Sequence, residues 1–240
     1  EIALRVMRSR ILVEKKRTKN TLNLNEQKLD NKDMASLAQY EKLDGVVSLS
    51  LRNNQFDYHG VQDLASSPYL KNLTSLNLMN NAVGDKGLLL LAESPNLSQL
   101  EYLNLENTGI TALGILALSQ SPHLSRLKEL NLSGNDLREK GLRILAESGN
   151  FKNLVKLRIS GVPVGDSGFL ALVHSNTLSQ LEELEAMGNT ITRKSLDSMT
   201  TASKLARLKK LDLRRNKLKE ADLIFLADTP KFQALEALRF

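Results

Sequence analysis

One short stretch decides the fold of this 240-residue chain: residues 73–81, which read LTSLNLMNN. The pattern returns every 27 residues, and its central leucine stands at Leu49, Leu76, Leu103, Leu130, Leu157, Leu184, Leu211 and Leu238. A second apolar residue follows each of these leucines two positions later. A fixed period of this length indicates a repeat protein built from one stacked unit. The period runs from residue 19 to residue 240 without an insertion.

Each repeat changes its hydrophobic pattern halfway along. Apolar and polar residues alternate over residues 73–78, which predicts a short, half-buried strand. Further on, Leu88, Leu91 and Ala92 are spaced as on one face of a helix. Pro95 then ends the helix, because proline cannot continue its hydrogen bonding. One unit is therefore expected to contribute one strand and one helix.

Polar positions keep the same period. An asparagine follows the central leucine by five residues at Asn54, Asn81, Asn135, Asn189 and Asn216. At the bend after the strand, this side chain can bond backbone groups of adjacent coils. Thr108 and Val162 replace it in two repeats, where we expect local loosening. Asp85 and Asp166 lie just before their predicted helices, where a carboxylate complements the helix N-terminus.

A strand and one short helix cannot bury both apolar faces alone, whereas stacked neighbours can. The pattern Leu76-x-Leu78-x-x-Asn81, with Gly87 and Leu91 following, resembles the leucine-rich repeat of ribonuclease-inhibitor-like proteins. The resemblance implies an α/β solenoid shaped like a horseshoe, with a parallel sheet on the concave face and helices on the convex face. About eight units begin at residues 19, 46, 73, 100, 127, 154, 181 and 208, and a partial unit begins at 235. The repeats most resemble those of secreted effectors of intracellular bacterial pathogens.

The two ends differ from the array. Residues 1–18 do not fit the period, and their apolar residues are spaced to form an amphipathic helix. We expect an N-terminal helical cap that covers the first repeat, with a membrane-surface helix as the alternative. At the other end, the partial strand from residue 235 needs a cap or further sequence, or its edge stays partly open.

The chain has no stretch with the pattern of a signal peptide or a membrane-spanning helix. We therefore expect a cytoplasmic protein. The resemblance to secreted effectors implies translocation into the cytosol of a host cell by a specialised secretion system.

The sequence holds no catalytic or metal-binding motif. It has no cysteine, and its three histidines, His59, His123 and His174, occupy different phases of the repeat and cannot converge on a metal ion. The glycine-containing stretches at residues 84–87 and 165–168 lack the spacing of phosphate loops and are predicted turns. We expect neither catalysis nor a cofactor.

The charge distribution favours a protein partner. The formal net charge is +6, from 33 Lys and Arg and 27 Asp and Glu, but seven of these bases and two of the acids lie in residues 1–19. The array is therefore nearly neutral, and the charges predicted on its concave face alternate in sign. Nucleic acid prefers a clustered basic stripe with stacking aromatics. We expect a folded protein partner, no nucleic acid, no membrane, and a monomer in isolation.

Specificity in such an array must lie in the strand residues that point away from the core. The predicted partner-binding residues are Asn77, Met79, Tyr102, Asn104, Glu106, Glu129, Lys156, Arg158, Glu183, Glu185, Met187, Lys210, Asp212 and Arg214. Arg52 and, in the loop after the second strand, Tyr58 and His59 are predicted to extend the site along the rim. Large apolar side chains on a sheet surface dominate interface energetics, so Met79, Tyr102 and Met187 are the expected anchors.

The sequence thus predicts a non-enzymatic module that binds another protein, an enzyme or a fellow effector, in its concave face. The resemblance to ribonuclease-inhibitor-like repeats and to effectors implies that binding inhibits the partner by covering its active site. Two alternatives stay open. The array is a substrate-recruiting adaptor within a larger ligase-type effector, or it binds anionic surfaces through its basic N-terminal helix.

Overall fold

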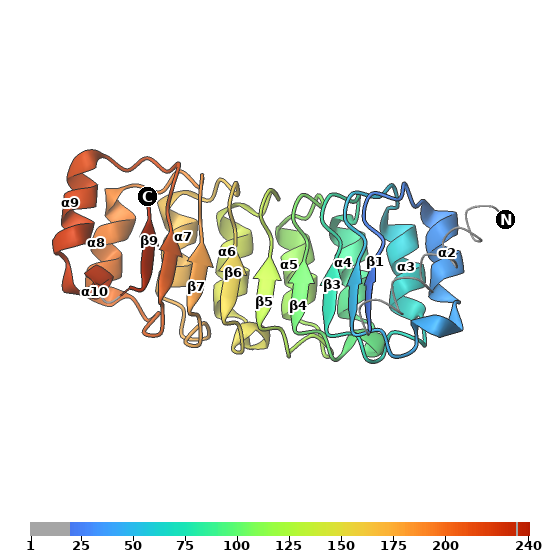
Figure 1. The fold of residues 1–240 in the computed structure, drawn as a ribbon. Coiled ribbons are helices and arrows are strands. Elements are labelled where there is room, and N and C mark those ends of the chain that lie inside the picture. Colours follow the sequence, from blue (N-terminus) through green and yellow to red (C-terminus); the bar gives the residue numbers. More distant parts are fainter. Residues whose placement is uncertain (1–19, 234) are drawn as a thin grey trace.

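The computed structural model describes residues 20–233 and 235–240, and the predicted cap at residues 1–18 lies outside this part. Within the described residues, nine short strands form one parallel sheet in chain order (Figure 1). The strands are β1 (Thr21–Asn23), β2 (Ser48–Ser50), β3 (Ser75–Asn77), β4 (Tyr102–Asn104), β5 (Glu129–Asn131), β6 (Lys156–Arg158), β7 (Glu183–Glu185), β8 (Lys210–Asp212) and β9 (Ala237–Arg239). Each central leucine lies beside the next, as Leu76 does beside Leu103. The 27-residue period is thus the register of the sheet.

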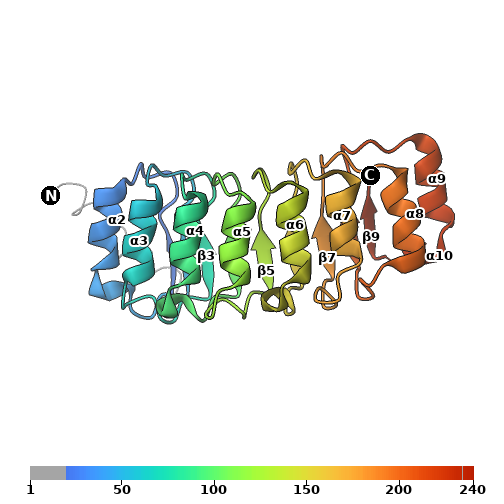
Figure 2. The same cartoon turned by 180° about the vertical axis from the view of Figure 1, so that it is seen from behind.

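The helices form a second layer behind the sheet (Figure 2). They are α2 (Asn31–Ala38), α3 (Tyr58–Ser66), α4 (Gly84–Ala92), α5 (Ala112–Ser119), α6 (Arg138–Glu147), α7 (Gly165–Val173), α8 (Arg193–Ala202), α9 (Glu220–Asp228) and α10 (Pro230–Gln233). Short 3₁₀ turns, η1 (Glu41–Leu43), η2 (Pro95–Leu97) and η3 (Gly149–Phe151), lead from three of the helices back to the sheet. The leucine-rich-repeat architecture that the sequence implied is confirmed.

The core between the two layers is almost entirely aliphatic. In the third coil, Leu76 and Leu78 from the strand and Leu88 and Leu91 from the helix are fully buried. Each buried leucine contributes about 1.5–3 kcal/mol relative to an exposed one. A helix is about 10–12 Å wide, whereas neighbouring strands lie about 4.8 Å apart, so the helical layer spreads more than the sheet. The array therefore curves with the sheet on its inner side.

The asparagine ladder forms as the sequence predicts. The Asn135 side-chain amide donates to the carbonyl oxygens of Leu105 at 2.7 Å and Leu132 at 2.9 Å. Its Oδ1 accepts from the backbone N–H groups of Thr108 at 3.2 Å and Ile110 at 3.0 Å. Comparable bonds to the preceding coil are made by Asn54, Asn81, Asn189 and Asn216. Each of these amides joins its own coil to the one before it.

The two replacements in the ladder behave differently. Thr108 is buried, and its hydroxyl donates at 2.6 Å to Leu105 within its own coil. Val162 is fully buried and has no polar group to offer, although its backbone N–H donates to Asn189 at 2.8 Å. Both coils thus keep bonds from the following asparagine. The expected loosening at these positions stays a prediction.

A second ladder, of serines, runs along the ends of the helices. Ser94 donates through its hydroxyl to the carbonyl oxygen of Ala65, 29 residues earlier, at 2.5 Å. Equivalent bonds are made by Ser67, Ser121, Ser148 and Ser175. These serines also keep the 27-residue period, so the sequence contains this signal although it was not among the predictions. They satisfy helix carbonyls that would otherwise lack a partner.

The aspartates at the helix starts lie within the first turn of their helices rather than just before them, still where a carboxylate complements the helix N-terminus, and they also bond the neighbouring helix. Asp85 lies inside the first turn of α4, and its carboxylate accepts from the backbone N–H groups of Thr111 at 2.8 Å and Gly114 at 2.9 Å in the next coil. Asp166 accepts from Thr192 in the same way at 2.9 Å. Stacking brings adjacent helix starts side by side, within reach of this short side chain. A Cβ on Gly114 would lie 2.6 Å from Asp85 Oδ1, which explains the periodic glycine there.

Replacing Asn135 by alanine should destabilise the array. The buried carbonyls of Leu105 and Leu132 would lose this donor, and we expect the free energy of unfolding to fall by about 3 kcal/mol. Urea denaturation followed by circular dichroism measures the loss. The matched control is Asn96→Ala, which removes one longer bond of 3.3 Å to Ala65 and should cost less than about 1 kcal/mol. Equal losses in the two variants would contradict the role of the ladder.

Candidate functional site

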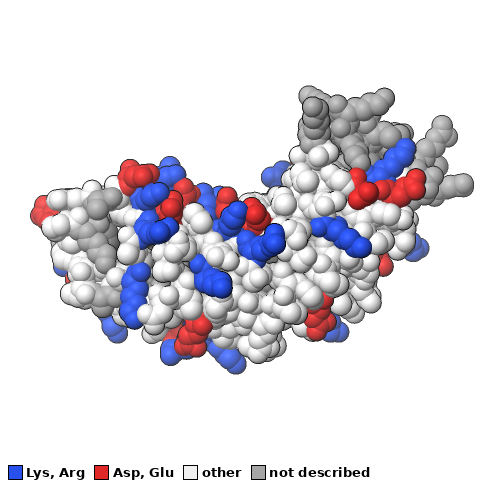
Figure 3. Space-filling model, turned by 90° about the horizontal axis from the view of Figure 1, so that it is seen from below, with Lys and Arg blue, Asp and Glu red and all other residues white. Residues whose placement is uncertain are grey.

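The concave face presents the first and third residues of every strand, while the central leucine points into the core. The entry row, the first residues, reads Thr21, Ser48, Ser75, Tyr102, Glu129, Lys156, Glu183, Lys210 and Ala237. The exit row, the third residues, reads Asn23, Ser50, Asn77, Asn104, Asn131, Arg158, Glu185, Asp212 and Arg239. Figure 3 shows the hollowed outline of the molecule, with acidic and basic side chains interspersed along its C-terminal half. The rows bring most of the predicted site onto one continuous surface.

Ion pairs link the charged residues of β5, β6 and β7 across the sheet. Lys156 contacts Glu183 directly and lies 3.4 Å from Glu185. Arg158 lies 3.0 Å from Glu185 and 3.9 Å from Glu129. The side chains of Lys156 and Arg158 are only 20% and 23% exposed. Opposite charges facing each other in register stabilise a sheet, and these residues largely neutralise one another.

Glu183 is the centre of this network. Ammonium groups from both neighbouring strands donate to it, Lys156 on one side and Lys210 at 2.5 Å on the other. These two hydrogen bonds lower the pKa of Glu183 to about 2, and outweigh its partial burial, which acts in the opposite direction. The carboxylate is therefore charged throughout the physiological pH range.

Two predicted partner-binding residues are less accessible than expected. Asn104 is 6% exposed and Asp212 is 7% exposed, because each side chain bends back to accept from the backbone N–H two residues ahead. Those N–H groups belong to Glu106 and Arg214, at 3.0 and 3.1 Å. The local bend after each strand leaves an N–H group that an exit-row Asn or Asp satisfies. Contact of these two side chains with a partner stays a prediction.

The three predicted apolar anchors do not form one cluster. Among the described strands only β4 carries an aromatic residue, Tyr102, which begins the strand and is half-buried. Met79 is also half-buried but lies two residues past the end of β3, at the opposite end of the strands. Met187 lies three coils beyond Tyr102 and, like Met79, two residues past the end of its strand, so Met187 and Tyr102 are separated by about 14 Å across the sheet and about 13 Å along it. A partner that touches all three must cover much of the concave face.

The rim residues lie between the end of β2 and the first turn of α3. Tyr58 and His59 form the first turn of α3 rather than the loop that was predicted. Asp57 caps this helix, accepting from His59 N–H at 2.9 Å, and that bond holds the pKa of Asp57 below its usual value despite partial burial. Arg52 pairs with Glu26 at 2.7 Å.

Sequence reasoning missed a run of bases that begins just after α8, passes along β8 and ends at the N-cap of α9. Residues 204–219 hold eight Lys and Arg and a single acid, Asp212. The eight bases are Lys204, Arg207, Lys209, Lys210, Arg214, Arg215, Lys217 and Lys219, and all are exposed. The predicted site includes only Lys210 and Arg214 of these eight bases, because the other six lie outside the strand positions from which it was drawn. A count of charges along each coil identifies these residues from the sequence. We call this set of eight bases the β8 stripe.

The described residues contain neither a metal-binding cluster nor a membrane-spanning helix. No group of three His, Cys, Asp or Glu side chains within residues 20–233 and 235–240 could hold a metal ion. None of the helices in the same ranges combines the length and the apolar character needed to cross a membrane.

Comparison with known proteins identifies the fold. A family model described as Leucine Rich repeat matches residues 69–92 and 123–146. The structure is similar to internalin C2 from Listeria monocytogenes, with a TM-score of 0.62 and 22% sequence identity over 91% of this chain and 79% of that one. It is also similar to internalin InlF from Listeria monocytogenes, with a TM-score of 0.56 and 21% identity over 86% of this chain.

The chain spans only half the length of InlF. At these identities the likeness shows the fold alone. Among curated proteins, none matches the sequence at a significant level. The chain has the leucine-rich-repeat fold, which is typical of modules that bind other proteins.

Acid should weaken the array through Glu183. Its pKa of about 2 lies below the usual 4.5 of an unfolded glutamate, so its stabilising contribution is present above pH 4.5 and is lost as the pH falls toward 2. The melting temperature of the wild type should fall over this interval, and that of Glu183→Gln should fall less. Glu93→Gln is the control, because Glu93 is exposed and joins no ion pair among the described residues. Parallel curves for wild type and Glu183→Gln would contradict the assignment.

Proposed function

We propose that this leucine-rich-repeat array is a non-enzymatic binding module that holds another folded protein across its concave face. The observation that supports this proposal is the difference between the central residue of each strand and the residues on either side of it. The central leucine is the same residue in every coil and is buried from β1 to β8, whereas the entry and exit rows vary and most of their side chains are at least partly exposed, apart from the buried Asn104, Asn131 and Asp212. A surface that is free to vary on a constant scaffold is suited to recognition.

The concave face also has the character of a protein interface. Tyr102 offers an amphipathic ring on a rigid strand, and the Lys156–Glu183 network next to it is already neutralised, so a partner meets little uncompensated charge there. Aromatic residues on rigid elements often supply most of the binding energy. A curved surface several strands wide fits a folded domain better than a small molecule.

The proposal extends to inhibition and location. A domain seated in the concavity has one of its surfaces covered, and if that surface holds an active site, binding inhibits the enzyme. Action as a monomeric effector in a host cytosol belongs to the same proposal, and its support is the resemblance of the repeats to those of secreted effectors.

The proposal is tested with a double variant. The purified array captures proteins from host-cell lysate, and mass spectrometry identifies those retained. Tyr102→Ala with Met187→Arg should reduce retention of the specific partner at least tenfold, because it removes one anchor and places an unpaired charge at another. The activity of a captured enzyme, measured with and without the array, then tests inhibition.

The matched control carries comparable changes on the helical side. Leu113 is 64% exposed on α5, and His123 lies in the loop that follows this helix. Leu113→Arg with His123→Ala should retain the partner at the wild-type level. Loss of the partner in this control, or its retention by the concave-face variant with an unchanged melting temperature, would refute the assignment.

A further inference from the structure

The β8 stripe carries charge that the fold does not use. Within the stripe, Lys209 pairs with Glu182 at 2.8 Å and Lys210 with Glu183 at 2.5 Å. Arg214 pairs at 2.6 Å with the buried Asp212. Among the described residues, the other five bases have no carboxylate within ion-pair distance: Lys204, Arg207, Arg215, Lys217 and Lys219. The stripe therefore presents a net positive surface, unlike the neutralised network beside it.

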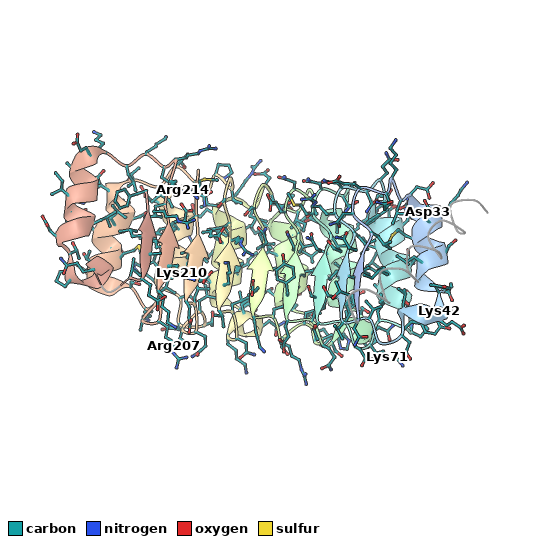
Figure 4. All side chains as sticks on the ribbon, in the orientation of Figure 1. Asp33, Lys42, Lys71, Arg207, Lys210 and Arg214 are labelled. Atoms are coloured by element: carbon teal, nitrogen blue, oxygen red, sulfur yellow. The ribbon has the colours of Figure 1, made fainter. Side chains whose placement is uncertain are left out.

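The middle of the stripe follows β8. Figure 4 shows Arg207 at the lower edge, Lys210 on the strand and Arg214 at the upper rim, in one line along β8. Arg207 bonds the amide oxygen of Gln180 at 2.6 Å and pairs with no carboxylate among the described residues, so these residues leave its charge uncompensated. Next to Lys210 on the last strand lies Ala237, beside a hollow that has a mixed lining of bases (Lys156, Lys210, Arg239) and acids (Glu183, Glu185, Asp212).

The width of the stripe limits what can bind it. The same window one repeat earlier, residues 177–192, holds three glutamates and no base. These carboxylates lie on or beside β7, about 4.8 Å from the stripe at the usual strand spacing. A helix about 10–12 Å wide, a nucleic-acid duplex or a membrane would therefore also cover β7, where the carboxylates are paired with bases and no free positive charge is offered. A single extended chain fits the stripe alone.

We propose that the β8 stripe binds an extended acidic segment of the partner protein, laid across the concave face along β8. Side chains of an extended chain repeat about every 6.7 Å on one face, so acidic residues at alternate positions reach successive bases of the stripe. Oppositely charged surfaces also raise the rate of association. The inference rests on the proposed function, because it names the part of the partner that meets the C-terminal repeats.

The test uses a fluorescein-labelled eight-residue peptide of alternating Glu and Ser, with fluorescence anisotropy in low-salt buffer as the readout. The wild type should bind this peptide and should not bind the same peptide with Gln in place of Glu. The stripe variant is Arg207→Glu, Arg215→Glu and Lys217→Glu, three bases that form no ion pair among the described residues. We expect its Kd to rise on the order of tenfold or more.

The control variant changes net charge equally outside the stripe, with Lys71→Glu, Lys140→Glu and Lys152→Glu, all exposed. Its Kd should change by about twofold or less, because salt screens distant charges. Equal weakening in both variants, or none in the stripe variant, would overturn the proposal. If the charge reversals lower the melting temperature, the same three positions changed to Gln provide the test, with a smaller expected loss.

Two further probes decide the class of ligand. Duplex DNA and phosphatidylserine vesicles are titrated against the same proteins, and tighter binding of either one than of the peptide, lost in the stripe variant, would overturn the assignment to an acidic segment. The peptide assay needs no partner protein, whereas the test with Tyr102→Ala and Met187→Arg measures retention of the partner protein. Failure of one is therefore distinguishable from failure of the other.

Discussion

No coil of this protein can bury its own apolar side, and the rest of the structure depends on that constraint. A three-residue strand and a helix of eight to ten residues leave Leu76, Leu88 and their equivalents open until the next coil covers them. The main stabilising contacts are therefore those between one coil and the next. The 27-residue period follows, because an insertion would displace all of these contacts at once.

The polar ladders also join neighbouring coils. Asn135 bonds 25 to 30 residues back, Ser94 bonds 29 residues back, and Asp85 bonds 26 to 29 residues forward. Each one satisfies backbone groups that stacking buries, which is costly when they stay unpaired. Leucines supply the driving force for stacking, but they pack without strict direction. The ladders hold each coil at one register.

Because the fold depends on buried leucines and polar ladders, the concave face is free for recognition. Since the central leucines and the ladders carry the fold, the entry and exit rows can change without loss of the core. The structure uses that freedom unevenly. Lys156 and Arg158 are held in a shared network with three glutamates, whereas Arg215 and Lys217, two coils away, are exposed and unpaired among the described residues. One face thus combines a neutralised region with a charged one.

The sequence by itself determined the repeat, its register, the order of strand and helix, and the asparagine ladder, because each depends on contacts between equivalent positions of neighbouring coils. It also placed Tyr102 on the concave face, since strand residues alternate. Only the tertiary structure decided the rest. Asp85 reaches the next helix, Asn104 folds back onto its own backbone, and Arg207, Lys210 and Arg214 line up along β8. These outcomes depend on side-chain reach between groups whose positions in space arise only when the coils are stacked.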